Sequence, residues 1–354
     1  MKKAYLVLEN GRVFEGLSFG AEANNAGELV FTTGVVGYLE TLTDPAYFGQ
    51  IVLQTFPLVG NYGVIEEDVA GKKSYLKGYV VREWCNTPSN FRCDYDIDKF
   101  LKEQGIPGIY GVDTREITKV IREEGVMNAM ICSEIPEDMT VIKEYKIEGG
   151  VANTTNDETV VCPADGEEKY SVAVLNLGSY DAIVKELNAK GVKATVVPSS
   201  TSADDVLKMG VDGVVVSDGA GDPRENEAVI SEVAKLFGKL PMLGISLGHQ
   251  TMALSKGGEI EKLKYGHRGG NQPAKQIGGN RSFMTSQNHG YVVKSATVNG
   301  AVESFVNLND GSCEGLEYPF EKALSVQFIP EKFKGPHDTS FIYDKFISLM
   351  GGAK

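Results

Sequence analysis

The segment with the clearest potential for chemistry is Gly244–Gln250, which reads Gly-Ile-Ser-Leu-Gly-His-Gln. It follows the apolar run 240–243 and leads into Thr251–Leu254, so we expect a buried strand, a sharp turn and then a helix. This is the pattern of a nucleophile elbow, in which small residues allow a strained turn that exposes one side chain over a helix N-terminus. The side chain at that point is Ser246.

The same segment fits the Gly-x-Ser-x-Gly pattern of serine hydrolases. That mechanism needs an acid and then a histidine further along the chain, and Asp310 followed by His337 satisfies the order. Because so short a motif occurs often by chance, we keep this interpretation as a minor alternative, which an assay with a nonpolar ester would test.

Strands and helices alternate from Tyr170 onward. Buried strands are predicted at 171–176, 193–198, 212–217 and 242–245, with helices between them at 181–188, 202–209 and 225–238. Such alternation is typical of a doubly wound, mostly parallel sheet. Ligands of such sheets bind at the carboxyl ends of the strands. Three glycine-rich or polar segments are predicted to follow buried strands directly: 217–223, the elbow at 244–250, and 285–291.

The first part of the chain has a different pattern. Short strands surround the turn Asn10-Gly11, which predicts a hairpin, and helices are expected at Tyr95–Glu103 and Thr114–Glu124. We therefore predict an N-terminal domain at 1–146, a linker at 147–169 and a second domain at 170–354. An ordered surface loop is a nearly equal alternative for the linker.

Composition excludes several classes of function. The net charge of −13 argues against a nucleic-acid surface, which needs clustered Lys and Arg. No apolar run reaches transmembrane length, and the stretch before Glu9 is too short for a signal sequence. The five cysteines are scattered and form no Cys-x-x-Cys pair, so neither a zinc site nor a disulfide framework is predicted. We expect a cytoplasmic protein with no metal, membrane or nucleic-acid partner.

Several segments together carry a family resemblance. In their order along the chain, four of them resemble the class I, triad-type glutamine amidotransferase domain: 217–223, 244–250, 285–291 and 324–331. Further motifs at 264–271, 43–45, 60–63 and 111–115 extend the likeness over nearly the whole chain, which resembles the small subunit of carbamoyl-phosphate synthase.

The resemblance implies a β/β/α N-terminal domain followed by a doubly wound amidotransferase domain. Members of the family release ammonia from L-glutamine, for carbamoyl phosphate and so for pyrimidine and arginine synthesis. The ammonia passes to a large subunit, which would be the partner and the place of ATP and Mg²⁺, with no cofactor in this chain. The implied glutamine contacts are Gly219, Gly221, Leu247, Gln250, Asn288, Gly290 and Tyr291.

The catalytic positions depart from the family pattern. The nucleophile position holds Ser246 instead of cysteine, and the base position holds Ile329 instead of histidine, while the acid Glu331 remains. A serine hydroxyl depends on a positioned base, which an isoleucine cannot supply. Loss of either group alone would cost on the order of 10⁴–10⁶ in rate. Glutaminase activity of this chain is therefore predicted to be very low or absent, and Glu331 to be a solvated carboxylate.

None of the four histidines looks recruited as a new base. His249, His267, His289 and His337 each lie in a segment where the family has histidine, so we expect structural roles for them. His249 is three residues beyond Ser246 and shares a helix face with it.

Three versions of the family interpretation remain. The favoured one is a small subunit that still docks its large subunit, which then uses free ammonia. The second is a paralogue that binds glutamine as a sensor, as the retained Gln250, Asn288 and Tyr291 suggest. In the third, Ser246 was introduced deliberately, although a single change would then have sufficed.

Overall fold

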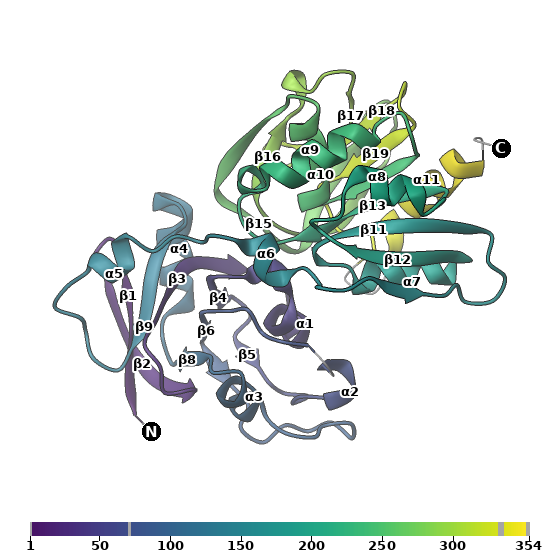
Figure 1. Cartoon of the computed structure of the whole chain (residues 1–354). Helices are drawn as coiled ribbons and strands as arrows, with labels where there is room; N and C mark the ends of the chain where they lie inside the picture. Colours follow the sequence, from purple (N-terminus) through teal and green to yellow (C-terminus); the bar gives the residue numbers. More distant parts are fainter. Residues whose placement is uncertain (1, 70–71, 332–335, 352–354) are drawn as a thin grey trace. The chain divides into compact units, whose positions relative to one another are not determined.

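The computed structural model describes residues 2–69, 72–331 and 336–351. Two compact units divide the chain, Met1–Ile147 and Glu148–Lys354. Figure 1 follows the chain through both units. Within the described ranges, no helix is long and apolar enough to cross a membrane.

The first unit is built on a closed barrel whose strands follow the order β1-β2-β8-β6-β4-β3-β9. The predicted hairpin is present, since β1 and β2 pair antiparallel with Val7 opposite Val13. The barrel strands are β1 (Lys3–Leu8), β2 (Val13–Gly20), β3 (Asn25–Thr32), β4 (Gln50–Gln54), β6 (Gly78–Val81), β8 (Pro107–Tyr110) and β9 (Met127–Cys132). The short strands β5 (Leu58–Val59) and β7 (Glu83–Trp84) pair with each other.

Short helices complete the first unit: α1 (Tyr38–Thr43), α2 (Glu66–Val69), α3 (Ile97–Glu103), α4 (Thr114–Glu124) and α5 (Thr140–Lys143). Helix α4 has the predicted bounds because the Asp113 side chain caps the N–H groups of Arg115 and Glu116. Helix α3 starts two residues later than predicted, since Asp96 is its cap and accepts from the Lys99 N–H.

The second unit contains a mixed sheet in the order β10-β12-β11-β13-β14-β19-β18-β17-β15-β16. Strands β12, β11, β13, β14 and β19 run parallel, which confirms the predicted mostly parallel core, and the outer strands pair antiparallel. The bounds are β10 (Val160–Cys162), β11 (Tyr170–Ser179), β12 (Val192–Pro198), β13 (Gly213–Gly219), β14 (Met242–Ile245), β15 (Glu259–Gln276), β16 (Ser282–Lys294), β17 (Val302–Asn307), β18 (Cys313–Tyr318) and β19 (Ala323–Val326).

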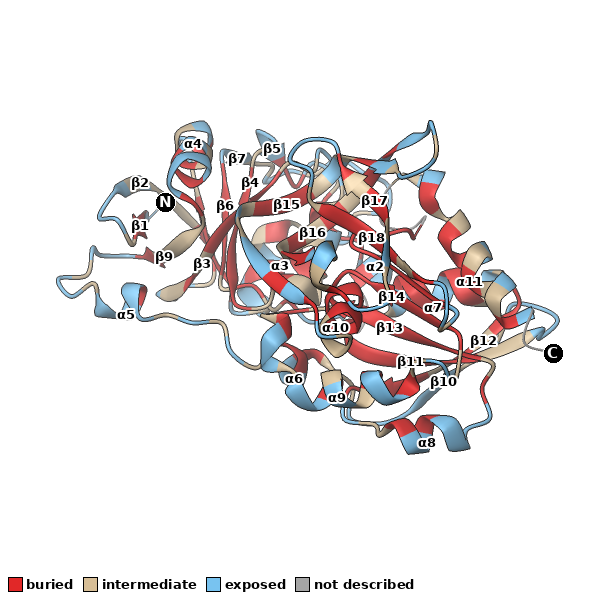
Figure 2. Cartoon of the chain, turned by 90° about the horizontal axis from the view of Figure 1, so that it is seen from above, coloured by how far each residue is buried: buried red, intermediate tan, exposed pale blue. Residues whose placement is uncertain are grey.

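Helices cover both faces of this sheet. One apolar core joins the sheet to α8 (Ala203–Lys208), α9 (Glu227–Leu236) and α10 (Leu247–Ser255). The other joins it to α7 (Asp181–Ala189) and α11 (Phe341–Gly351). Figure 2 shows β11, β13 and α10 largely in the colour of buried residues. A helix that is buried on most sides, such as α10, has little freedom to move its N-terminus.

Residues 148–169 belong to the second unit. They contain α6 (Gly150–Thr154) and β10, which pairs with β12. Helix α6 packs tightly on the loop after β13, because a Cβ on Gly150 would meet the Ala220 carbonyl oxygen at 2.5 Å. The segment thus contacts the second unit both through β10 and through α6.

The segment 285–291 was expected to follow a strand, and this expectation is wrong. It lies inside β16, which forms a long antiparallel ribbon with β15. The alternation of polar and apolar residues in a half-buried ribbon explains why its polar side chains looked like a loop.

Candidate functional site

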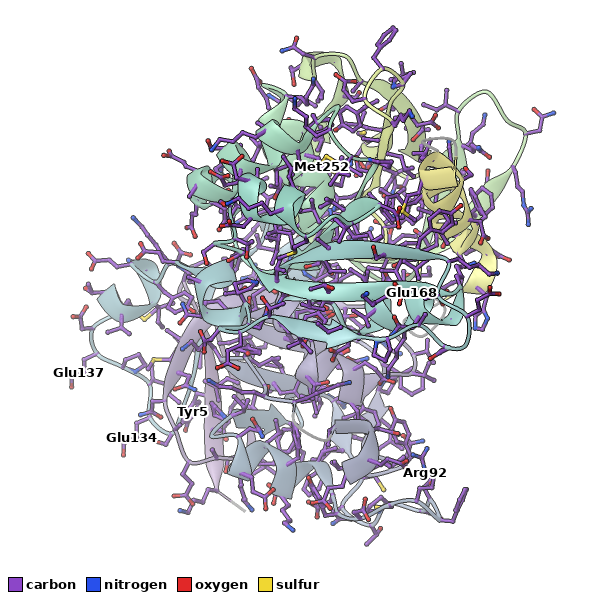
Figure 3. The ribbon with its side chains drawn as sticks, turned by 45° about the vertical axis from the view of Figure 1, so that its right-hand side comes forward. Tyr5, Arg92, Glu134, Glu137, Glu168 and Met252 are labelled. Atoms are coloured by element: carbon purple, nitrogen blue, oxygen red, sulfur yellow. The ribbon has the colours of Figure 1, made fainter. Side chains whose placement is uncertain are left out.

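The backbone at Ser246 has the form of a nucleophile elbow. Ser246 lies between β14 and α10 with φ 51° and ψ −106°, a strained conformation for a residue with a side chain. The flanking glycines serve packing. A Cβ on Gly248 would lie 2.0 Å from the Val216 carbonyl oxygen, and one on Gly244 would lie 2.5 Å from Sδ of Met252. Met252 lies in the interior of the second unit (Figure 3). The glycines thus bring α10 against the sheet, and Ser246 itself carries the strain.

Hydrogen bonds tie the elbow helix to two neighbouring segments. The buried Gln250 donates from Nε2 to the Tyr291 carbonyl at 2.8 Å and to Oε1 of Gln327 at 3.0 Å. These bonds bring together α10, β16 and the end of β19. Two residues that the family resemblance assigns to glutamine, Gln250 and Tyr291, are therefore direct neighbours.

The remaining predicted contacts lie on β16 and on the loop after β13. Asn288 and Gly290 are on β16, and Gly219 and Gly221 border the loop. The Nδ2 atom of Asn288 is buried and has no hydrogen-bond partner among the described residues. A buried amide nitrogen in that state favours a ligand that brings an acceptor.

The base position is apolar and buried. Ile329 is 5% exposed, and its backbone N–H donates to the Ser286 carbonyl at 2.8 Å. The strand before it lies beside the elbow, because β19 pairs with β14 and the Ser246 N–H donates to the Val326 carbonyl at 2.8 Å. The Ile329 side chain offers no atom that can accept a proton.

Glu331 is not solvated, so the expectation from the sequence is wrong. It is 2% exposed, and its Oε1 accepts a hydrogen bond from the Tyr343 hydroxyl at 2.6 Å. Burial, together with the Glu331 carboxylate, raises the pKa of Tyr343 well above its ordinary value, which keeps the hydroxyl protonated as a donor. Tyr343 comes from α11, twelve residues further on, and no local pattern pointed to it.

His249 is poorly suited to act as a base for Ser246. Its Nδ1 lies 2.8 Å from the Ser325 hydroxyl, and the whole side chain is buried. Burial lowers the pKa of His249 to about 3, so the imidazole stays neutral and is a weak proton acceptor. Its contacts are those of a residue that fixes α10 to β19.

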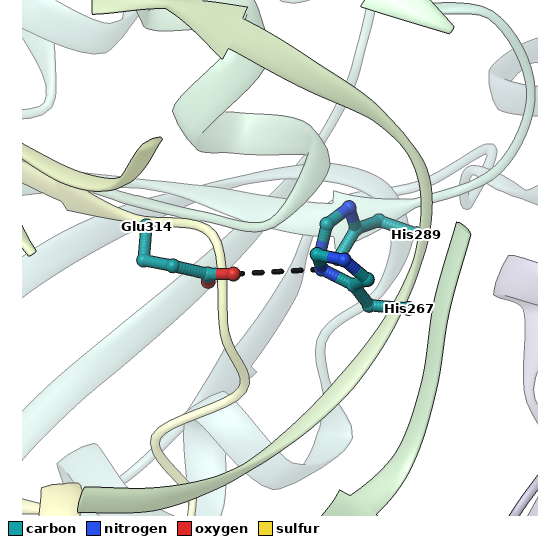
Figure 4. A group of neighbouring side chains, drawn as sticks. All are labelled: His267, His289 and Glu314. Atoms are coloured by element: carbon teal, nitrogen blue, oxygen red, sulfur yellow. Dashed lines mark ion pairs between the residues drawn. The ribbon is translucent and has the colours of Figure 1, made fainter. Parts of the chain in front are cut away.

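His267, His289 and Glu314 form the one group of described residues whose ligand atoms could meet at a metal ion, lying within 4.8 Å of one another (Figure 4). Protein groups already engage these atoms. Asn307 Nδ2 lies 2.8 Å from Glu314 Oε1 and 3.3 Å from His267 Nδ1. His289 is bonded at Nδ1 by the Tyr291 carbonyl and at Nε2 by Gln287. This arrangement fits a buried polar network between β15, β16, β17 and β18 better than a metal centre.

The acid and histidine of the hydrolase alternative have other roles. Asp310 Oδ2 lies 2.9 Å from Nε2 of His267, and Asp310 Oδ1 accepts from Ser312. His337 lies on an exposed turn of 3₁₀ helix at His337–Thr339. The acid–histidine pair that Asp310 forms is therefore with His267 and not with His337, as the hydrolase alternative would need.

Arg224 is a further residue at the site that the sequence did not single out. Its guanidinium bonds the Asp222 carboxylate at 2.6 Å and lies 5.6 Å from the centre of the Tyr291 ring. Burial acts to raise the pKa of Asp222, but the bonds from Arg224 outweigh it and the pKa is lowered. Arg224 thus links the loop after β13 to Tyr291.

Two family models match the chain. Residues 6–131 match the carbamoyl-phosphate synthase small chain, CPSase domain, and residues 173–349 match glutamine amidotransferase class-I. Three similar curated proteins are each named carbamoyl phosphate synthase small chain. That of Oceanobacillus iheyensis is 39% identical over 100% of this chain and 98% of its own length. That of Clostridium perfringens is 40% identical over 98% and 99%, and that of Fusobacterium nucleatum 42% over 98% and 98%.

Proposed function

The chain belongs to the family of carbamoyl-phosphate synthase small chains, and we propose that it is a member whose own glutaminase step is lost. The family is the glutamine-hydrolysing small subunit of the synthase. In this proposal the chain keeps the scaffold of the amidotransferase domain and its place in the assembly. It forms no acyl-enzyme, and hydrolysis of glutamine at Ser246 is negligible.

The observation that carries this proposal is the apolar base position beside the elbow. Ile329 is buried there, Glu331 receives the Tyr343 hydroxyl, and the nearby His249 is neutral and bonded to Ser325. A serine without a general base is a very weak nucleophile toward an amide. The losses from the two departures overlap, because the nucleophile and base of a triad act as a unit, so either departure alone would remove most of the activity.

We propose further that a large subunit binds this chain and makes carbamoyl phosphate from ATP, bicarbonate and free ammonia. Support comes from the extent of the similarity, since the match covers 98–100% of this chain and 98–99% of the three relatives named as small chains. We place the assembly in the cytoplasm, where its product would feed pyrimidine and arginine synthesis.

A second candidate function is glutamine binding without hydrolysis. The Nδ2 atom of Asn288, which has no hydrogen-bond partner among the described residues, favours it, and so does the contact between Gln250 and Tyr291, which the resemblance also assigns to glutamine. Calorimetry with millimolar L-glutamine tests this candidate. Absence of binding would remove it and would leave the subunit proposal intact.

The test of the main proposal compares the wild-type chain with Ser246→Cys/Ile329→His, each with a matched large subunit. We expect no glutamate release and full ammonia-dependent carbamoyl phosphate synthesis for the wild type. The double variant should regain measurable glutamate release. Ser246→Cys alone is the matched control, because it supplies a thiol without a base and should recover much less.

Clear glutamate release by the wild type would overturn the loss of the glutaminase step. Failure of the chain to bind any large subunit would overturn its proposed place in the assembly. Turnover of a nonpolar ester by the wild type, lost in Ser246→Ala, would favour the hydrolase alternative.

A further inference from the structure

Two backbone N–H groups from different segments converge on one oxygen atom at the elbow. Oδ1 of Asp218 accepts from the Gly219 N–H at 2.7 Å and from the Leu247 N–H at 3.5 Å. Leu247 is the residue after the nucleophile position, whose N–H stabilises the oxyanion in a nucleophile elbow. Convergent N–H donors mark the place where negative charge develops on a reacting carbonyl oxygen.

We propose that the Asp218 carboxylate is an internal occupant of the oxyanion site. It takes the position that the amide oxygen of a bound substrate would need. This inference rests on the proposed function and deepens it. The site is closed to amide hydrolysis by a third feature, which is independent of Ser246 and Ile329.

The backbone around Asp218 is held firmly in place. The Ser217 hydroxyl accepts from the Leu177 N–H at 2.9 Å and donates to the Asp218 carbonyl at 2.8 Å. A Cβ on Gly219 would lie 2.0 Å from the Leu177 carbonyl oxygen, so this stretch of β13 lies directly against β11. Asp218 itself is 3% exposed. The carboxylate therefore has little freedom to leave the donors by movement of its backbone.

The helix at the elbow also favours a carboxylate there. Ser246 occupies the N-cap position of α10 but makes no side-chain capping bond. The positive end of the helix dipole and the Leu247 N–H are satisfied by Asp218 instead. Removing a buried carboxylate from such donors costs free energy, because both sides lose a charge-assisted bond.

The consequence for chemistry follows from charge. Attack on the Cδ carbon of glutamine moves the electron pair of the C=O bond onto oxygen, and the new anion needs the two N–H donors. Because the Asp218 side-chain oxygen already accepts from these N–H groups, that anion would form without its donors. Restoring the thiol and the imidazole should then recover only part of the activity.

The experiment adds Asp218→Ala to Ser246→Cys/Ile329→His and measures glutamine hydrolysis with the large subunit present. Alanine removes the side-chain oxygen that accepts from the Gly219 and Leu247 N–H groups. We expect kcat to rise at least about tenfold, because one oxyanion donor is worth on the order of 10²–10³ in kcat. The control is Asp204→Ala in the same background, an exposed carboxylate on α8 that should give no such rise.

A second readout does not depend on turnover. A chloromethyl ketone analogue of glutamine alkylates the introduced thiol, and mass spectrometry follows the rate. Asp218→Ala should accelerate alkylation at least about fivefold, while Asp204→Ala should not. Equal rates with and without Asp218→Ala in both assays would overturn the inference. Glutamate release by the wild-type chain would instead count against the proposed function.

Discussion

The elbow at Gly244–Gln250 and the segment Gln327–Glu331, which follows β19, are neighbours in the second unit, joined by the bond from Gln250 to Gln327. The elbow keeps its strained backbone and its closely packed glycines. The segment after β19 forms a bridge from Ile329 to Ser286, and Ile329 stands at the position that the family resemblance assigns to the base. In both regions packing and pairing set the backbone, while the positions that the resemblance assigns to nucleophile and base hold a serine and an isoleucine.

A motif can persist for two reasons: because packing requires its residues, or because chemistry requires them. Gly248 and Gly244 are required by the packing of α10 against the sheet, whatever Ser246 does. A nucleophile and a base have no such requirement, since a buried serine and a buried isoleucine fill their space as well. A segment with the sequence of an elbow is therefore evidence for the fold. It is not evidence for a working nucleophile and base, which need evidence of their own.

The largest effect is expected from Gly248→Ala. The added methyl group would lie 2.0 Å from the Val216 carbonyl oxygen and 2.9 Å from that of Ser217, so strand or helix must move. We expect a loss of about 3 kcal/mol or more in unfolding free energy, measured by denaturant titration. Gly270→Ala is the control, because nothing lies within 4 Å of its Cβ, and it should change stability by less than about 0.5 kcal/mol. Equal effects of the two changes would contradict the conclusion that the packing of α10 against the sheet requires Gly248.

The second prediction concerns the carboxylate left behind at the end of β19. Tyr343→Phe removes the 2.6 Å hydrogen bond to the buried Glu331 and should cost about 2–3 kcal/mol, because bonds to charged groups are strong. Thermal and denaturant unfolding measure it. In Glu331→Gln/Tyr343→Phe the cost should be smaller than the sum of the two single changes. Additive losses would mean that Tyr343 acts through packing and not through Glu331.

Much of the fold could be predicted from local sequence signals. The β14 strand at 242–245 and the α4 helix at 114–124 have the predicted bounds, since an apolar run and the Asp113 cap are local features. The closure of the barrel in the first unit could not be predicted. It depends on pairing between distant strands, such as β1 with β9, which no short segment encodes.

The candidate site, like the barrel, could be predicted only where local motifs define it. The position and identity of Ser246 and Ile329 came from ordered motifs. The partner of Glu331 did not, because Tyr343 reaches it from another helix. The sequence analysis assigned no role to Asp218, which lies in a glycine-rich segment. Its position directly before Gly219, a predicted glutamine contact, could have drawn attention to its carboxyl group. Its meaning depends on the distance to the Leu247 N–H, which only the fold supplies.

The smallest effect, and the most direct test of the comparison, is expected from Ser246→Gly. Ser246 has φ 51° and makes no side-chain capping bond, so its side chain brings strain without compensation at the cap. The strain costs the folded protein roughly 1–3 kcal/mol, and glycine relieves it. Part of this gain in stability is lost, because glycine gives the unfolded chain more conformational entropy. We expect a net gain of about 1 kcal/mol in unfolding free energy.

Ser246→Ala separates strain from the hydroxyl, because alanine keeps Cβ and hence the strained backbone. It should stay within about 0.5 kcal/mol of the wild type. Both variants should support ammonia-dependent carbamoyl phosphate synthesis at the wild-type rate when the large subunit is present. If Ser246→Gly lowers stability or that rate, the serine hydroxyl has a role that the elbow geometry does not reveal. The elbow would then have kept a chemical function together with its backbone.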